Sequence, residues 1–168
     1  MKKRPLGITI LAILNIAGGI ILFVGQVLMI GFLDELPSLG ISSPAAMISV
    51  AVLAILALVS GIGMWLGRSW GWWLGAFYYV YGIVRNLNGV ISLSGFSDEF
   101  GAPSQGIETY YIRFGARVVF YFFILVYLFR GNILEHFGLA KYPRSRIAMT
   151  LALVAVAVAL LWFGISML

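Results

Sequence analysis

The sequence predicts an all-α fold, a polytopic integral membrane helix bundle with five transmembrane helices in a single membrane domain over residues 1–168. Two observations carry this prediction. The chain is 62% hydrophobic and only 10% charged, whereas a soluble domain has about half apolar and about a quarter charged residues. It also contains five long apolar runs, each near the ~20 residues that cross ~30 Å of hydrocarbon. A core of this size is too small to bury so many apolar side chains, so we expect part of the apolar surface to face lipid.

The predicted spans are residues 6–32, 44–67, 70–94, 109–129 and 147–167. The first run follows Lys2, Lys3 and Arg4, but it is far longer than the apolar region of a signal peptide, and no cleavage site follows it. Polar segments with turn residues separate the runs. In the last of these segments, a plain connector with a few apolar contacts is the preferred interpretation. The alternative is a short helix over residues 133–137 that stops at Gly138 and lies on the membrane surface.

The loop charges predict an orientation. With the N-terminus inside, the outer loops hold no Lys or Arg, and the inner side holds Lys2, Lys3, Arg4, Arg68, Arg130, Lys141, Arg144 and Arg146. The acids of the outer side are Asp34, Glu35, Asp98, Glu99 and Glu108. Lys and Arg concentrate in the cytoplasmic loops of membrane proteins. We therefore expect a multi-pass protein of the cell membrane with a cytoplasmic N-terminus and a C-terminus outside.

Three segments carry a resemblance. They are "RPLGITILAILNIAGGI", "GIGMWLGRSWGWWLG" and "VYLFRGNILEHFG". These resemble segments of an uncharacterised group of small multi-pass membrane proteins of archaea and bacteria. The resemblance covers roughly the first 138 residues and implies a four-helix membrane unit, to which the fifth span adds a C-terminal helix. It implies no activity and no site residues.

Glycines mark the helix faces that we expect to pack. Gly75, Gly82 and Gly89 recur at intervals of seven in the third span, and Gly63 and Gly67 form a GxxxG pattern at the end of the second. In a bilayer, small residues let two helices approach closely. Ordinary packing within one chain is the preferred interpretation, and the seam of a homodimer is the alternative.

Three arginines interrupt otherwise apolar spans: Arg85 in the third, and Arg113 and Arg117 in the fourth. No Asp or Glu lies within any predicted span, although an arginine near the bilayer centre costs about 2.5–3.5 kcal/mol on insertion scales. One interpretation is that they reach the surface and pair with loop acids. The other is an outward-facing pocket for an anion, which the planar guanidinium binds with two hydrogen bonds. The predicted anion-binding or partner-binding site comprises Arg85, Arg113, Arg117, Asn86, Gln26 and Glu108.

The sequence offers little for catalysis. Cysteine is absent, and the single histidine, His136, falls in a predicted loop. We find no nucleophile with a base, no phosphate-binding loop and no metal-ligand cluster. The sequence therefore predicts no enzyme, no cofactor, no metal and no nucleic-acid partner.

Two functions remain in view, with a lipid-modifying enzyme as a weaker third. The first is a small structural or accessory integral membrane subunit that docks a partner membrane protein or a second copy of itself. The second is binding or transport of an anionic solute or a lipid headgroup at the arginines. The expected partners are the lipid bilayer, another membrane protein and, for the second function, a lipid phosphate or a small anion.

Overall fold

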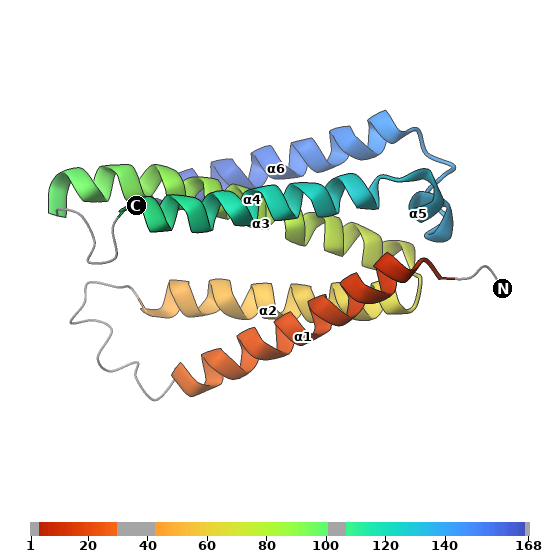
Figure 1. Cartoon of the computed structure of the whole chain (residues 1–168), viewed down its shortest axis with the longest axis horizontal. Helices are drawn as coiled ribbons and strands as arrows, with labels where there is room; N and C mark the ends of the chain where they lie inside the picture. The colour runs from red at the N-terminus through yellow and green to blue at the C-terminus, as the bar shows by residue number, and fades with distance from the viewer. Residues whose placement is uncertain (1–3, 30–42, 101–106, 167–168) are drawn as a thin grey trace. The chain divides into compact units, whose positions relative to one another are not determined.

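The computed structural model of the chain describes residues 4–29, 43–100 and 107–166, and all the regular structure in these ranges is helical (Figure 1). The prediction of an all-α fold is confirmed for this part of the chain. The helices are α1 (Leu6–Met29), α2 (Ser43–Trp65), α3 (Ser69–Phe100), α4 (Ile107–Leu128), α5 (Gly131–His136) and α6 (Arg144–Ser166).

The helix bounds follow the predicted spans, with one clear difference. α3 continues to Phe100, six residues beyond the predicted end at residue 94. The sequence from Ser69 to Phe100 contains no proline, and the first one after it is Pro103. Serine, aspartate and glutamate only weakly oppose a helix, whereas proline breaks it. The polar stretch that was predicted to be a loop therefore begins as the last turns of α3.

Two helices of the described chain are long and apolar enough to cross a membrane, Leu6–Leu28 in α1 and Glu108–Leu128 in α4. Their large apolar side chains are extensively exposed, as Ile21 in α1 and Ile112 in α4 illustrate. Apolar surface on this scale is unusual for a soluble monomer and is suited to contact with lipid. The five-span topology stays a prediction.

The chain divides into two compact units. The first contains the chain up to Tyr78 together with Glu135–Leu139, and the second contains Tyr79–Leu134 and the chain from Ala140 onward. The single membrane domain that the sequence suggested stays a prediction. Each unit is built around one antiparallel pair of helices that meet closely at glycine.

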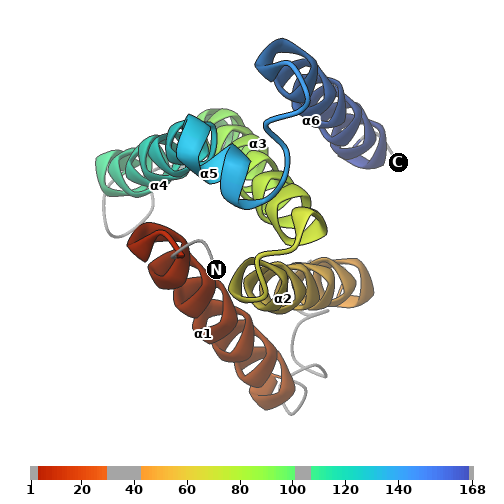
Figure 2. The same ribbon diagram turned by 90° about the vertical axis from the view of Figure 1, so that its right-hand side faces the viewer.

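In the first unit, α1 and α2 run antiparallel (Figure 1) and lie side by side in close contact (Figure 2). A Cβ atom added to Gly19 would lie 2.9 Å from the carbonyl oxygen of Ala54. One added to Gly61 would lie 2.9 Å from the carbonyl oxygen of Ala12. Because no side chain separates the backbones at these two points, the helices reach the short spacing that small residues allow.

The turn from α2 to α3 is set by Gly67, whose φ is +66°. Its amide donates to the carbonyl of Met64, and the amide of Arg68 donates to that of Gly63. These two hydrogen bonds define a Schellman motif, in which glycine is favoured because its conformation is left-handed. The turn brings the end of α2 against the start of α3, where Gly63 and Gly71 meet backbone to backbone.

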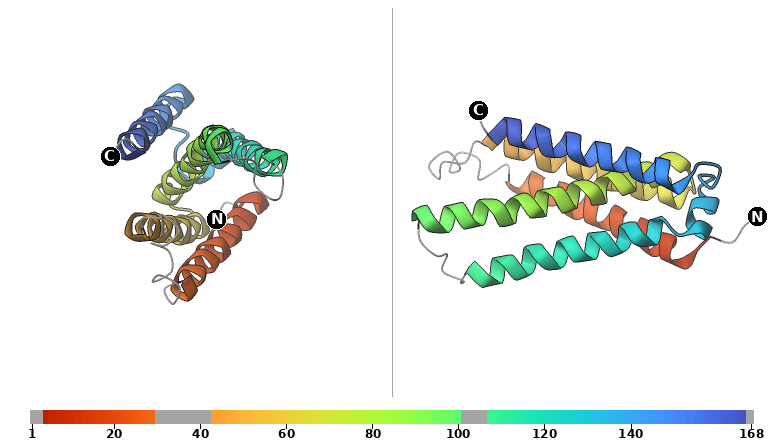
Figure 3. Two further views of the ribbon diagram at one scale, coloured as in Figure 1. Left: turned by 90° about the vertical axis from the view of Figure 1, so that its left-hand side faces the viewer. Right: turned by 90° about the horizontal axis from the view of Figure 1, so that it is seen from above.

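In the second unit, the later part of α3 runs beside α4 (Figure 3). The rings of Tyr79 and Tyr121 lie 5.8 Å apart between centroids. A Cβ atom on Gly82 would lie 2.7 Å from the Tyr121 ring, so Gly82 provides the space that this ring occupies. Ile147 and Leu151 are the buried side chains of α6 among those described.

The short helix α5 overlaps the predicted segment 133–137. Ile133 and Leu134 are buried, as is Phe137 just after the helix. Gly138 follows with a φ of +68°, the left-handed conformation that ends helices. These apolar side chains are covered in the structure, and the location of the helix on a membrane surface stays a prediction.

The contact between Gly63 and Gly71 yields a stability prediction. We expect Gly71→Ala to lower the free energy of unfolding by about 1–3 kcal/mol, the range for overpacked sites, because its Cβ would meet the Gly63 backbone. Gly18→Ala is the matched control, since nothing lies within 4 Å of a Cβ at that helical position. Thermal unfolding in detergent micelles compares the two variants. Equal midpoints for both would contradict the close approach.

Candidate functional site

The three arginines of the predicted site all have exposed side chains in the second unit. The contact between Gly82 and Tyr121 sets the register of α3 against α4. Because the helices are antiparallel, three residues forward from Gly82 to Arg85 correspond to three residues back from Tyr121 to Val118. Arg85 and Arg117 therefore lie at matching depth, within about one residue's rise of 1.5 Å.

The asparagines beside Arg85 are satisfied within their own helix. Asn86 is 7% exposed, and its side-chain amide donates to the carbonyl of Gly82 at 2.6 Å. Asn88 donates in the same way to the carbonyl of Val84 at 3.1 Å. The structure thus gives both amides a structural role, since a polar side chain in an apolar helix needs a hydrogen-bond acceptor.

The other two members of the predicted site are Glu108 and Gln26. Glu108 is exposed in the first turn of α4, where a carboxylate is stabilised by the helix dipole. Within the described part of the second unit, no ion pair joins it to Arg113 or Arg117. Gln26 is half-buried in α1 and belongs to the first unit. The convergence of these residues on one inward-facing site stays a prediction.

Arg113 and Arg117 belong to an exposed apolar face of α4. We call this surface the α4 face; it consists of Ile112, Arg113, Ala116, Arg117, Phe120 and Phe123, all exposed. These positions recur every three or four residues and share one side of the helix. Tyr121, Ile124 and Leu128 follow Arg117 at helical spacing, and Ile124 and Leu128 are buried. Arg117 therefore continues the packed stripe of α4 towards the start of the helix, where its side chain is exposed.

The first unit contains a buried polar contact that sequence reasoning missed. Asn15 is 5% exposed, and its amide donates to the hydroxyl of Ser60 at 3.2 Å. The Ser60 hydroxyl in turn donates to the carbonyl of Ala57 at 3.0 Å. Ser60 is the only polar side chain between residues 50 and 67, and this isolation in an apolar helix is the signal that predicts a partner on a neighbouring helix.

The predicted packing glycines have different surroundings. Gly63 meets Trp70 and Gly71, Gly75 meets the end of Met64, and Gly82 meets Tyr121. Gly67, in contrast, forms the turn after α2, where its backbone conformation matters more than its size. The packing of Gly89 lies outside the described residues.

His136 lies against the turn at Gly67. Its Nε2 atom is buried and has no hydrogen-bond partner in the described part of the chain, and a Cβ on Gly67 would lie 3.3 Å from it. Burial lowers the pKa of the imidazole below its ordinary value of 6.5, and the positive charge of Arg4 lowers it further. Both effects favour the neutral ring.

No group of three or more His, Cys, Asp or Glu side chains in residues 4–29, 43–100 and 107–166 is placed to hold a metal ion. Comparison of the chain with protein-family models, with curated proteins and with solved structures gives no match. The functional proposal therefore depends on the geometry of the described residues.

The lowered pKa of His136 gives a pH prediction. The unfolded chain binds a proton near pH 6.5 and the folded chain only at lower pH. This contribution to stability is therefore present above pH 6.5 and is lost as the pH falls towards the lowered pKa of the folded state. We expect the unfolding temperature to fall between pH 7.5 and 5.5, and to fall less in His136→Gln. An identical fall in that variant would show that the imidazole is not responsible.

Proposed function

We propose that this chain is a small accessory integral membrane subunit. It crosses the bilayer five times and docks a partner membrane protein through the α4 face. The N-terminus is cytoplasmic and the C-terminus lies outside. The chain works as a binding protein and carries out no reaction of its own.

The charge distribution supports this topology. The predicted inner loops contain eight Lys and Arg residues and the predicted outer loops contain none, as the positive-inside rule requires. In the first unit, the Arg4 guanidinium lies over the Trp65 ring, 4.8 Å from its centroid, so α1 begins where α2 ends. In the second unit, Arg144 lies beside Gly131. The first residue of α6 is therefore close to the end of α4. Each unit gathers its loop cations at one end.

The observation that carries the docking proposal is the exposure of Arg113 and Arg117 within an apolar helix face. An arginine that faces hydrocarbon costs about 2.5–3.5 kcal/mol at mid-depth, and Glu108, the acidic side chain described in the second unit, pairs with neither residue. A carboxylate on a partner helix compensates this charge through a bidentate hydrogen bond. Phe120 and Phe123 flank the arginines, and aromatic residues with arginine are typical of interface centres.

An anionic solute or lipid headgroup is the second candidate. Arg113 and Arg117 are one turn apart on one face, so both side chains reach a single phosphate or carboxylate. Arg85, at the depth of Arg117, supplies a third cation within the same unit. This alternative uses the same arginines, but they bind the anionic group of a solute or lipid instead of a carboxylate on a partner helix.

Site-specific photocrosslinking separates the two candidates. We expect a photoreactive phenylalanine analogue in place of Phe123, which is 65% exposed on the α4 face, to give a discrete protein adduct in intact membranes. The double variant Arg113→Gln, Arg117→Gln should reduce that adduct about tenfold, which corresponds to about 1.4 kcal/mol. The control position is Leu153, which is 67% exposed on α6.

The adduct identifies the partner. One of twice the chain mass indicates a second copy, and one of another mass indicates a different protein; both support docking. Adducts only with lipid at Phe123 would favour the headgroup alternative. Equal protein adducts at Phe123 and Leu153, unaffected by the arginine substitutions, would contradict both.

A further inference from the structure

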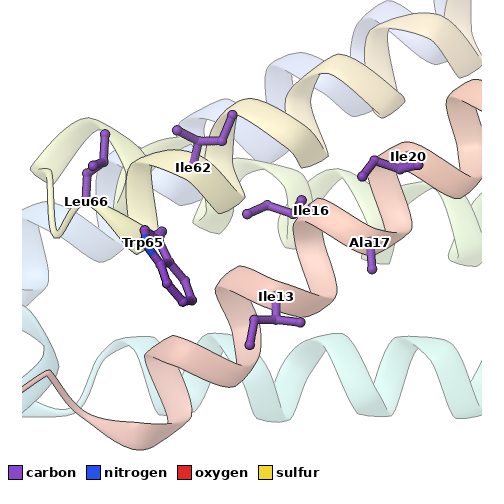
Figure 4. Close-up of a pocket in the computed structure, with 7 residues that line it drawn as sticks. All are labelled: Ile13, Ile16, Ala17, Ile20, Ile62, Trp65 and Leu66. Carbon is purple, nitrogen blue, oxygen red and sulfur yellow. The ribbon is translucent and has the colours of Figure 1, made fainter.

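An open apolar groove of about 370 Å³ runs between α1 and α2, wholly within the first unit (Figure 4). Its walls include Ile13, Ile16, Ala17 and Ile20 from α1, and Ile62 and Trp65 from α2. Most of these side chains are exposed, so the groove opens to the surroundings along its length. Its volume falls within the roughly 300–1,000 Å³ that is typical of ligand sites.

One end of the groove is cationic. Figure 4 shows Trp65 directed from α2 towards α1, where it forms part of the groove wall. The Arg4 guanidinium lies over that same ring, 4.8 Å from its centroid. Arg4 is exposed, as is Arg68 in the turn that follows α2. Trp65, which forms part of the apolar wall, is therefore in contact with the Arg4 guanidinium, and the N–H groups of this guanidinium are accessible.

The charge around this end is predominantly positive. Lys2 and Lys3 precede Arg4 in the sequence, and Glu135 is the one acidic residue of the described first unit. An arginine that stacks on an aromatic ring keeps the edge of its guanidinium plane available for hydrogen bonds. The arrangement is complementary to a molecule with a phosphate at one end and a hydrocarbon chain at the other.

We propose that this groove binds one anionic phospholipid, with its phosphate at Arg4 and an acyl chain along Ile13 and Ile20. The rise from Ile13 to Ile20 is about 10 Å along the helix axis, which is within one leaflet of a ~30 Å hydrocarbon core. The acyl chain lies against the exposed Ala17, whose small side chain leaves room in the groove. The proposal rests on the membrane location proposed above but is independent of the α4 face, so failed crosslinking at Phe123 leaves it intact.

Native mass spectrometry of the purified full chain tests this site. The probes are phosphatidylglycerol and phosphatidylcholine with identical acyl chains. We expect one phosphatidylglycerol per chain to bind about tenfold more tightly than phosphatidylcholine, because the charge-assisted hydrogen bond to Arg4 favours the anionic lipid. Arg4→Gln should abolish this preference. Ala17→Trp, which fills the groove, should weaken binding of both lipids about tenfold or more.

Matched controls use exposed positions on α6. Arg146→Gln removes a cation from a loop end without touching the groove, and Ala152→Trp adds the same bulk elsewhere; both should bind lipid as the wild type does. Undiminished lipid binding in Ala17→Trp, or a full phosphatidylglycerol preference in Arg4→Gln, would overturn the proposal. So would a dimer that Ala17→Trp dissociates while lipid binding is unchanged, because the groove would then hold a second copy.

Discussion

Polar groups inside apolar helices need partners, and much of this fold follows from that need. The backbone amides and carbonyls are satisfied within each helix, the arrangement that hydrocarbon surroundings require. Asn15 finds the Ser60 hydroxyl on a neighbouring helix, and Asn86 and Asn88 use carbonyls of their own helix. Arg113 and Arg117 differ, because they are exposed and Glu108, the acidic side chain described in the second unit, does not pair with them. For this reason, we propose that they contact a molecule outside the chain.

Glycine gives the helices their close contacts. In lipid, apolar side chains gain little by leaving one apolar surface for another, so helix association depends on dense packing and on a few polar contacts. Gly19 and Gly61 join α1 to α2, and Gly63 with Gly71 joins α2 to α3. The polar contact between Asn15 and Ser60 lies between the first two of these glycine contacts along α2, so packing and hydrogen bonding fix the same register. Gly82 provides the corresponding contact in the second unit.

The sequence predicts the helices well and their faces poorly. Long apolar runs define where the helices lie, and Gly138 marks the turn that follows α5. However, lipid-facing and protein-facing residues are both apolar, so periodicity alone does not show which side of α4 is packed. The sequence predicts that Arg113 and Arg117 belong to one inward-facing group; their side chains are exposed, and the convergence itself stays a prediction. The contact of Arg4 with Trp65 joins residues sixty-one positions apart, and no local pattern predicts it.

Single-cysteine labelling tests most directly whether α3 carries Arg85 across a membrane. The chain has no cysteine of its own, so each introduced thiol is labelled without background. Ser69→Cys and Ser145→Cys probe the predicted inner loops, and Ser104→Cys probes the predicted outer loop, which lies outside the described residues. In intact cells, a membrane-impermeant maleimide should label only Ser104→Cys, and the other two variants should react after lysis. Equal labelling of Ser69→Cys and Ser104→Cys in intact cells would contradict a membrane-spanning α3 and the topology proposed for the whole chain.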